Sequence, residues 1–163
     1  MLNLKSDSTS RRRQAGFSLV ELLVVIAIIL IILFFAVPQY NKARMNAQET
    51  GAIAGLKTIY QAEIQYQSEF GDFATSLAQL GPPAATGGTE GPSSAGLIAG
   101  GLAGGNSSGY VFTVTQTPTG YSVTAVPKTF NSTGRRTFYS DQSGIVRQNW
   151  GSDPATANSP EVK

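Results

Sequence analysis

The sequence predicts an α+β protein in which one long N-terminal helix packs against a small C-terminal antiparallel sheet of about four strands. Three observations predict this fold. Residues 22–37 are an unbroken run of sixteen apolar side chains. Residues 39–70 repeat apolar side chains every three or four positions, which is typical of a helix with one buried face. Residues 110–150 alternate apolar and polar side chains between turn sequences, which is typical of strands.

The composition excludes several kinds of chemistry. The chain of 163 residues contains no cysteine and no histidine. Disulfides, Ser-His-Asp catalysis and zinc sites built on cysteine or histidine are therefore excluded. Residues 1–16 hold four of the twelve basic residues, and the remainder has eight basic and nine acidic residues. This balance predicts no nucleic-acid partner.

Residues 1–16 are predicted to be a polar leader that is removed from the mature chain. The leader carries three consecutive arginines and ends in a small residue, Gly16. A secretory signal has its small cleavage residue after the apolar region, whereas Gly16 precedes it. Cleavage at this position leaves the apolar segment on the mature protein. By the positive-inside rule, the arginines keep the leader cytoplasmic and the rest of the chain crosses the membrane.

Residues 17–38 are predicted to be a single membrane-spanning helix. The twenty-one residues from Phe17 to Val37 give roughly 30 Å of helix, the thickness of the hydrocarbon core of a bilayer. Glu21 is the one charged residue inside this segment. A carboxylate costs about 2.5 to 3.5 kcal/mol near the bilayer centre, less near an end, and usually has a partner there. We therefore expect Glu21 to pair with a cation.

The residues from Gly16 to Ile29, Gly-Phe-Ser-Leu-Val-Glu-Leu-Leu-Val-Val-Ile-Ala-Ile-Ile, follow a basic leader. This stretch resembles the class III leader junction of type IV pilins and type II secretion pseudopilins. The resemblance implies that a prepilin peptidase and methyltransferase cuts after Gly16 and methylates the new amino terminus at Phe17. It also implies that Glu21 neutralises the amino terminus of a neighbouring subunit, and Pro38 stands where the family commonly has a helix-kinking proline. Arg11, Arg12 and Arg13 fit either membrane topology or recognition by the peptidase.

The resemblance implies a pilin-like fold and the function of a structural subunit, not an enzyme. The expected assembly is a homo-oligomeric helical filament of the type IV pilus kind, built from subunits that first lie in membrane lipid. The expected location is the bacterial inner membrane, with one span and an assembly platform as partner, followed by an extracellular or periplasmic filament. One alternative is the major pseudopilin of a type II secretion system. An alternative of a different class is a membrane-anchored extracytoplasmic enzyme or binding module.

Residues 39–80 are predicted to continue the helix to about Phe70 and to add a short helical turn after Gly71. Pro38 predicts a kink or local weakening near residues 33–38, and Gly51 and Gly55 predict further weak points. The expected buried stripe consists of Ile53, Leu56, Ile59, Tyr60, Ile64, Tyr66 and Phe70. The expected polar side consists of Lys42, Arg44, Gln48, Glu49, Lys57, Gln61 and Gln65.

Residues 81–109 are predicted to be a loop with little regular structure, because ten of these twenty-nine residues are glycine. Within the loop, Leu97, Ile98 and Leu102 are expected to pack a short helical turn onto the domain, with the rest exposed. The run from Gly100 to Gly105 does not predict a phosphate-binding loop, because no strand precedes it and no Lys-Ser/Thr follows it.

The C-terminal part is predicted to hold four strands, at 110–115, 121–126, 136–140 and 145–150, followed by an extended tail at 151–163. No cofactor is expected, with one possible exception. Major pseudopilins often bind calcium near the C terminus, and the resemblance therefore raises Asp141 and Asp153 as candidate ligands. Their other interpretation is turn capping, which is the ordinary role of an aspartate in an Asp-x-x-Gly sequence.

Overall fold

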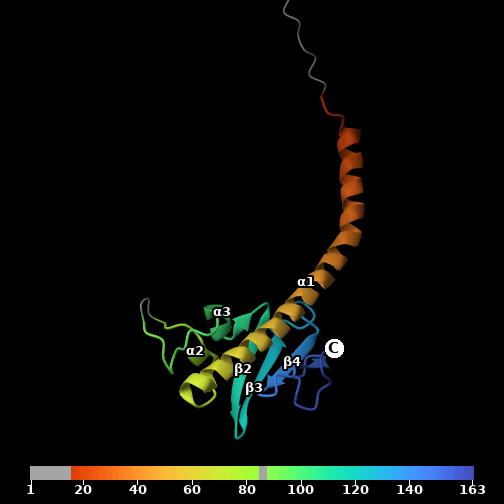
Figure 1. The fold of residues 1–163 in the computed structure, drawn as a ribbon. Helices are drawn as coiled ribbons and strands as arrows, with labels where there is room; N and C mark the ends of the chain where they lie inside the picture. The colour runs from red at the N-terminus through yellow and green to blue at the C-terminus, as the bar shows by residue number, and fades with distance from the viewer. Residues whose placement is uncertain (1–15, 85–87) are drawn as a thin grey trace, which may run out of the picture. The chain divides into compact units, whose positions relative to one another are not determined.

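The computed structural model describes residues 16–84 and 88–163 and has the expected α+β fold. The 52-residue helix α1 (Leu19–Phe70) is followed by two short helices and a five-stranded antiparallel sheet (Figure 1). The chain divides into two compact units after Pro38, so the first part of α1 belongs to one unit and its remainder to the other. The second unit contains the sheet and the hydrophobic core.

The second part of α1 packs across one face of the sheet (Figure 1). The helix ends where the sequence predicts, because Gly71 adopts a left-handed conformation with φ of +88°. Part of the predicted stripe is wrong: Ile64 is exposed, whereas Glu49, placed on the polar side, is buried. The buried residues are Glu49, Ala52, Leu56, Ile59, Ala62, Glu63 and Tyr66.

Gly51 and Gly55 allow α1 to approach the sheet region closely. A Cβ atom at Gly51 would lie 2.5 Å from Oγ of Ser108, and one at Gly55 would lie 2.9 Å from the ring of Phe112. Both distances are shorter than real Cβ contacts, so a side chain at either position would force Ser108 or Phe112 to move. The prediction that the two glycines weaken the helix misses this role, since the contacts come from residues more than fifty positions away.

The five strands follow one another across the sheet in chain order, each antiparallel to the next. Tyr121, Val123 and Ala125 alternate on the buried face of the central strand β3. The sequence predicted about four strands; the fifth, β1, is a two-residue edge strand inside the glycine-rich region. The strands are β1 (Asn106–Ser107), β2 (Tyr110–Thr117), β3 (Gly120–Pro127), β4 (Arg136–Asp141) and β5 (Arg147–Trp150).

The connection between α1 and the sheet carries α2 (Leu77–Leu80) and α3 (Gly100–Ala103). Ile98 and Leu102 are buried beside these helices, as expected. Ala95, in contrast, is buried where the sequence predicted exposure. Its N–H donates to the carbonyl of Gln79 at 2.7 Å, so the returning chain pairs with the end of α2. The glycine-rich segment is therefore more ordered than its composition suggests.

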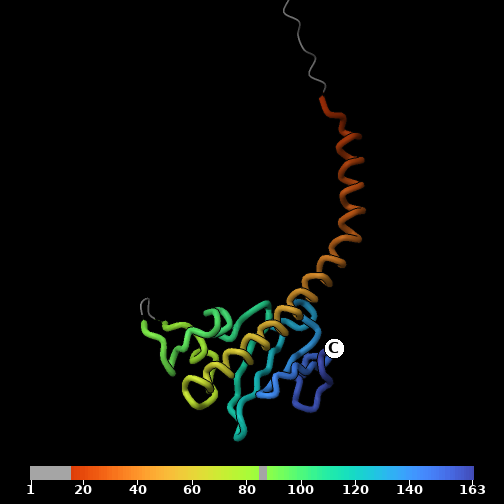
Figure 2. Tube along the Cα trace, in the orientation of Figure 1, coloured from red at the N-terminus to blue at the C-terminus, as the bar shows by residue number. Residues whose placement is uncertain are grey.

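The C-terminal tail returns to strand β5, as the end of the trace shows (Figure 2). The N–H of Gln148 donates to the carbonyl of Pro160 at 2.8 Å, and the N–H of Val162 donates to the carbonyl of Val146 at 2.9 Å. Ala155 is 2% exposed. The tail was predicted to be extended, but it contains bends and a turn in which the N–H of Ser159 donates to the carbonyl of Thr156, and the contacts with β5 hold it against the sheet.

Candidate assembly and processing site

The Gly16–Phe17 junction lies directly before α1 and is open to solvent. Gly16, Phe17 and Ser18 have no helical structure, and all three are exposed. An added Cβ at Gly16 would meet no atom within 4 Å. The backbone of this junction is therefore exposed in the single chain. Arg11, Arg12 and Arg13 lie outside the described residues.

Glu21 is the third residue of α1, and its carboxylate caps the start of the helix. Oε2 of Glu21 accepts a hydrogen bond of 2.8 Å from the N–H of Ser18, while the carbonyl of Ser18 accepts one of 3.2 Å from the N–H of Leu22. A serine followed three residues later by a glutamate is the sequence of a capping box. The carboxylate thus has a local hydrogen-bond partner and, among the described residues, no cationic one.

The apolar segment that follows Glu21 is uncovered in the single chain. The large apolar side chains from Phe17 to Val37 are between 46% and 82% exposed. Among the described residues, α1 is the one helix long and apolar enough to cross a membrane. An apolar surface of this extent requires lipid or other helices as neighbours.

Pro38 lies inside α1, which is assigned as continuous helix on both sides of it. Proline lacks the N–H that would donate the helix hydrogen bond at its position, which is the reason to expect a kink. The kink near residues 33–38 remains a prediction.

A buried ion pair joins α1 to strand β4. Glu49 is 1% exposed; its Oε2 lies 2.7 Å from one terminal guanidinium nitrogen of Arg136, and its Oε1 accepts a hydrogen bond of 2.8 Å from the N–H of Arg135. The guanidinium of Arg136 also donates to Gln148 and lies over the ring of Trp150, 5.2 Å from its centroid. The carboxylate and its partners therefore fix the start of β4 against the helix.

Glu63 is a second buried carboxylate on α1, but it has no cationic partner in the described part of the chain. Its Oε2 accepts a hydrogen bond of 2.9 Å from the N–H of Ala74, and its Oε1 has no partner. Burial raises the pKa of Glu63 to about 7, and the hydrogen bond from Ala74 opposes this rise. The hydroxyl of Tyr121 is also buried without a partner, and burial, followed by the charge of Glu63, raises its pKa.

The sequence interpretation missed the roles of Glu49 and Glu63. Glu49 stands between the polar residues Gln48 and Thr50 and looks like part of a solvated helix face, whereas Glu63 stands between Ala62 and Ile64. Their spacing did carry a signal: from Glu49, steps of three or four residues reach Ala52, Leu56 and Ile59, all of which are buried.

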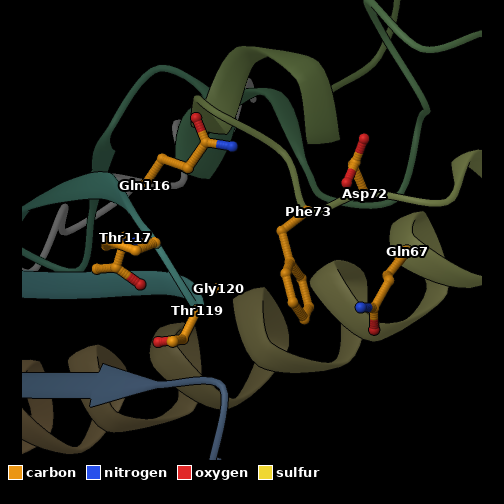
Figure 3. A pocket seen from close by; sticks show the side chains of 8 residues that line it. Gln67, Asp72, Phe73, Gln116, Thr117, Thr119 and Gly120 are labelled. Atoms are coloured by element: carbon orange, nitrogen blue, oxygen red, sulfur yellow. The ribbon is translucent and has the colours of Figure 1, made fainter.

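A shallow cleft of about 260 Å³ lies between the end of α1 and the β2–β3 hairpin (Figure 3). Asp72 and Phe73 line one side, and Thr117 and Thr119 line the other. Asp72 is the one carboxylate among its lining residues, so the cleft lacks the paired acid and base groups of a hydrolytic site.

Asp141 acts in a turn. Its Oδ1 accepts hydrogen bonds from the N–H and the hydroxyl of Ser143, and its carbonyl accepts one from the N–H of Gly144. The backbone carbonyl of Asp153 accepts hydrogen bonds from Thr137 and Asn149. Within residues 16–84 and 88–163, no group of three or more acidic side chains is placed to hold a metal ion. The geometry of Asp141 is that of turn capping, and calcium binding remains an untested expectation.

These features define a pilin-like protein: a helix with an uncovered apolar first part, a glutamate that caps its start, and an antiparallel sheet packed on its second part. Residues 11–37 match the family model described as the prokaryotic N-terminal methylation motif. The chain is also 35% identical over 68 residues to the type IV major pilin protein PilA of Myxococcus xanthus (strain DK1622). Both similarities support the predicted resemblance to type IV pilins and pseudopilins.

The similarity to the Myxococcus protein covers 40% of this chain and 31% of that relative, so the chain spans about a third of the length of the curated relative that it matches. No solved structure matches the chain significantly.

Proposed function

We propose that this chain is the structural subunit of a type IV pilus-like filament. In this proposal a prepilin peptidase cuts after Gly16 and methylates Phe17, and residues 17–38 hold the subunit in the bacterial inner membrane until an assembly platform moves it into the filament. The uncovered apolar helix with one carboxylate near its start carries the proposal. A type II secretion pseudopilus would use the same features; the pilus is favoured because the Myxococcus relative is named a major pilin.

The apolar helix supplies the assembly surface. In the membrane its side chains contact lipid, and in a filament they contact the helices of neighbouring subunits. Because both environments are apolar, close packing and polar pairing, not the transfer of apolar surface out of water, decide between them. Cleavage creates a positive amine at Phe17, which is the cation that Glu21 of another subunit needs.

The pairing between Glu21 and the amine acts mainly on register. Two opposite charges attract strongly in an apolar bundle, but their loss of hydration offsets much of this gain. An unpaired charge in the same place remains costly. Subunits are therefore stable only at the axial offset where each carboxylate meets an amine.

The first experiment measures the mature amino terminus. Mass spectrometry of the purified protein should find a chain that begins with methylated Phe17. Gly16→Leu should leave the leader attached, because the peptidase requires a small residue there, while the protein stays in the membrane fraction. A native protein that begins at Met1, or normal cleavage of Gly16→Leu, would refute the processing step.

The second experiment separates the charge of Glu21 from its capping role. Glutamine can replace glutamate in a capping box, so Glu21→Gln keeps a hydrogen bond from Ser18 and removes the charge. Loss of one partner from a buried pair costs about 3 to 5 kcal/mol, which is roughly a hundred-fold or more in subunit affinity. Both Glu21→Gln and Glu21→Ala should remain in the membrane and form few filaments. Normal filament yield from Glu21→Gln would show that the cap, not the charge, matters.

A further inference from the structure

A second, smaller cleft lies where α1 meets the loop between β3 and β4. It has a volume of about 160 Å³ and is lined by Asn41, Arg44 and Met45 of α1 and by Asn131 and Ser132 of the loop. The lining offers a guanidinium, two amides and a hydroxyl, and it contains no carboxylate. This set of donors suits an oxyanion, because arginine presents several N–H groups that match phosphate oxygens.

The polar groups of this cleft are not used elsewhere in the described chain. The ion pairs among the described residues are Glu49–Arg136 and Arg147–Glu161, so Arg44 takes part in neither. The loop is fixed by its backbone instead: the N–H of Asn131 donates to the carbonyl of Gly134, and the N–H of Ser132 donates to the carbonyl of Thr129. The hydroxyl of Thr133 is also bonded within the loop, to the backbone of Thr129, whereas the side chains of Asn131 and Ser132 remain available for a ligand.

The cleft also lies close in the chain to the end of the apolar segment. Arg44 follows Val37 by seven residues, which is about 10 Å along a helix. The headgroup layer of a bilayer adds roughly 5 to 7 Å outside the hydrocarbon core. Helical side chains lean toward the N-terminus of their helix, and an arginine is long enough to bridge the remaining distance.

Aromatic side chains accompany the cleft. Phe130 directly precedes Asn131 and is 40% exposed, and Tyr40 directly precedes Asn41 and is 67% exposed. Exposed aromatic residues beside basic ones are typical of surfaces at the membrane interface.

We propose that this cleft, which we call the Arg44 cleft (Asn41, Arg44, Met45, Asn131 and Ser132), binds the phosphate group of an anionic phospholipid in the outer leaflet of the inner membrane. The proposal rests on the proposed membrane insertion of the subunit. Bound phosphate holds the loop 129–134 and α1 against the membrane surface, and so restricts the orientation of the folded unit before assembly. Release from the lipid then accompanies entry into the filament.

The test uses the full-length protein purified from membranes in a mild detergent and titrated with phosphatidylglycerol, with bound lipid counted by native mass spectrometry. One basic side chain near an anionic surface contributes about 1 kcal/mol, so Arg44→Gln should weaken binding about five-fold. Ser132→Ala should weaken it less. Lys57→Gln is the matched control, because Lys57 is an exposed cation of the same helix outside the cleft.

Equal binding by Arg44→Gln, Lys57→Gln and the unchanged protein would overturn the proposal. Inorganic phosphate provides a separate arm: protection of the loop 129–134 from hydrogen exchange by phosphate but not by phosphatidylglycerol would also overturn it. Membrane fractionation and the mass of the amino terminus are measured in the same samples. Protein that is absent from the membrane fraction, or that keeps its leader, would count against the proposed function. An unchanged lipid affinity of Arg44→Gln in correctly inserted protein counts only against the Arg44 cleft.

Discussion

The folded unit should lose stability as the pH rises through neutrality, because of Glu63. This side chain is fully buried, and burial raises its pKa from 4.5 to about 7. The folded state therefore holds the proton more tightly than the unfolded state does. The contribution of protonated Glu63 to the free energy of unfolding is fully present below pH 4.5 and is lost as the pH rises through 7. The rise of the pKa from 4.5 to about 7 corresponds to about 3 kcal/mol in the free energy of unfolding.

Glu63→Gln should remove this pH dependence. A glutamine is neutral at every pH, and its carbonyl oxygen can still accept the hydrogen bond from the N–H of Ala74. Between pH 5 and pH 8.5, the free energy of unfolding of the unchanged protein should fall by about 2.5 kcal/mol relative to the variant.

The assay is urea unfolding of the full-length protein in detergent at several pH values, followed by circular dichroism and by the fluorescence of Trp150, the single tryptophan of the chain. Glu69→Gln is the control, since Glu69 is an exposed glutamate on the same helix. If the stability of the unchanged protein and of Glu63→Gln followed parallel curves across this range, the reasoning from burial would be refuted.

Two further substitutions test how α1 is attached to the sheet. Glu49→Ala should lower the free energy of unfolding by about 3 kcal/mol, because it leaves the guanidinium of Arg136 without its buried partner, whereas Glu69→Ala should change it by less than about 0.5 kcal/mol. Similar effects of the two alanine variants in urea unfolding would contradict this role. Gly55→Val should destabilise the unit by about 1 to 3 kcal/mol by overpacking against Phe112. Ala54→Val places the same side chain at an exposed neighbour, and equal thermal unfolding temperatures for the two valine variants would argue against the close approach.

Much of the fold could be predicted because its signals are local. The end of α1 at Phe70, the β2–β3 hairpin and the strand that follows it are marked by glycines, turn sequences and regular spacing within a few residues. The edge strand β1 could not be predicted in this way. Its two residues pair with Val111 and Tyr110, and nothing in their own sequence indicates a strand.

The C-terminal tail shows the same limit. Proline, serine and asparagine predict an extended tail, whereas the segment bends and turns back to the sheet. Its attachment to β5 depends on where the carbonyl of Pro160 lies, which only the folded structure determines.

Three glutamates on α1 show why the candidate site was easier to predict than the internal contacts of the folded unit. Glu21 stands out in the sequence because sixteen apolar residues follow it, so its charge conflicts with its surroundings wherever the helix packs. Glu49 lies between Gln48 and Thr50, and Glu63 lies between Gln61 and Gln65 with one apolar residue on each side, so neither stands in an unbroken apolar run and the sequence gives no such conflict. Their environments come from β4 and from the chain at Ala74, which supply a cation to the first and a single N–H to the second. A charge is therefore informative in sequence when its neighbours along the chain already exclude water, and uninformative when distant segments do so.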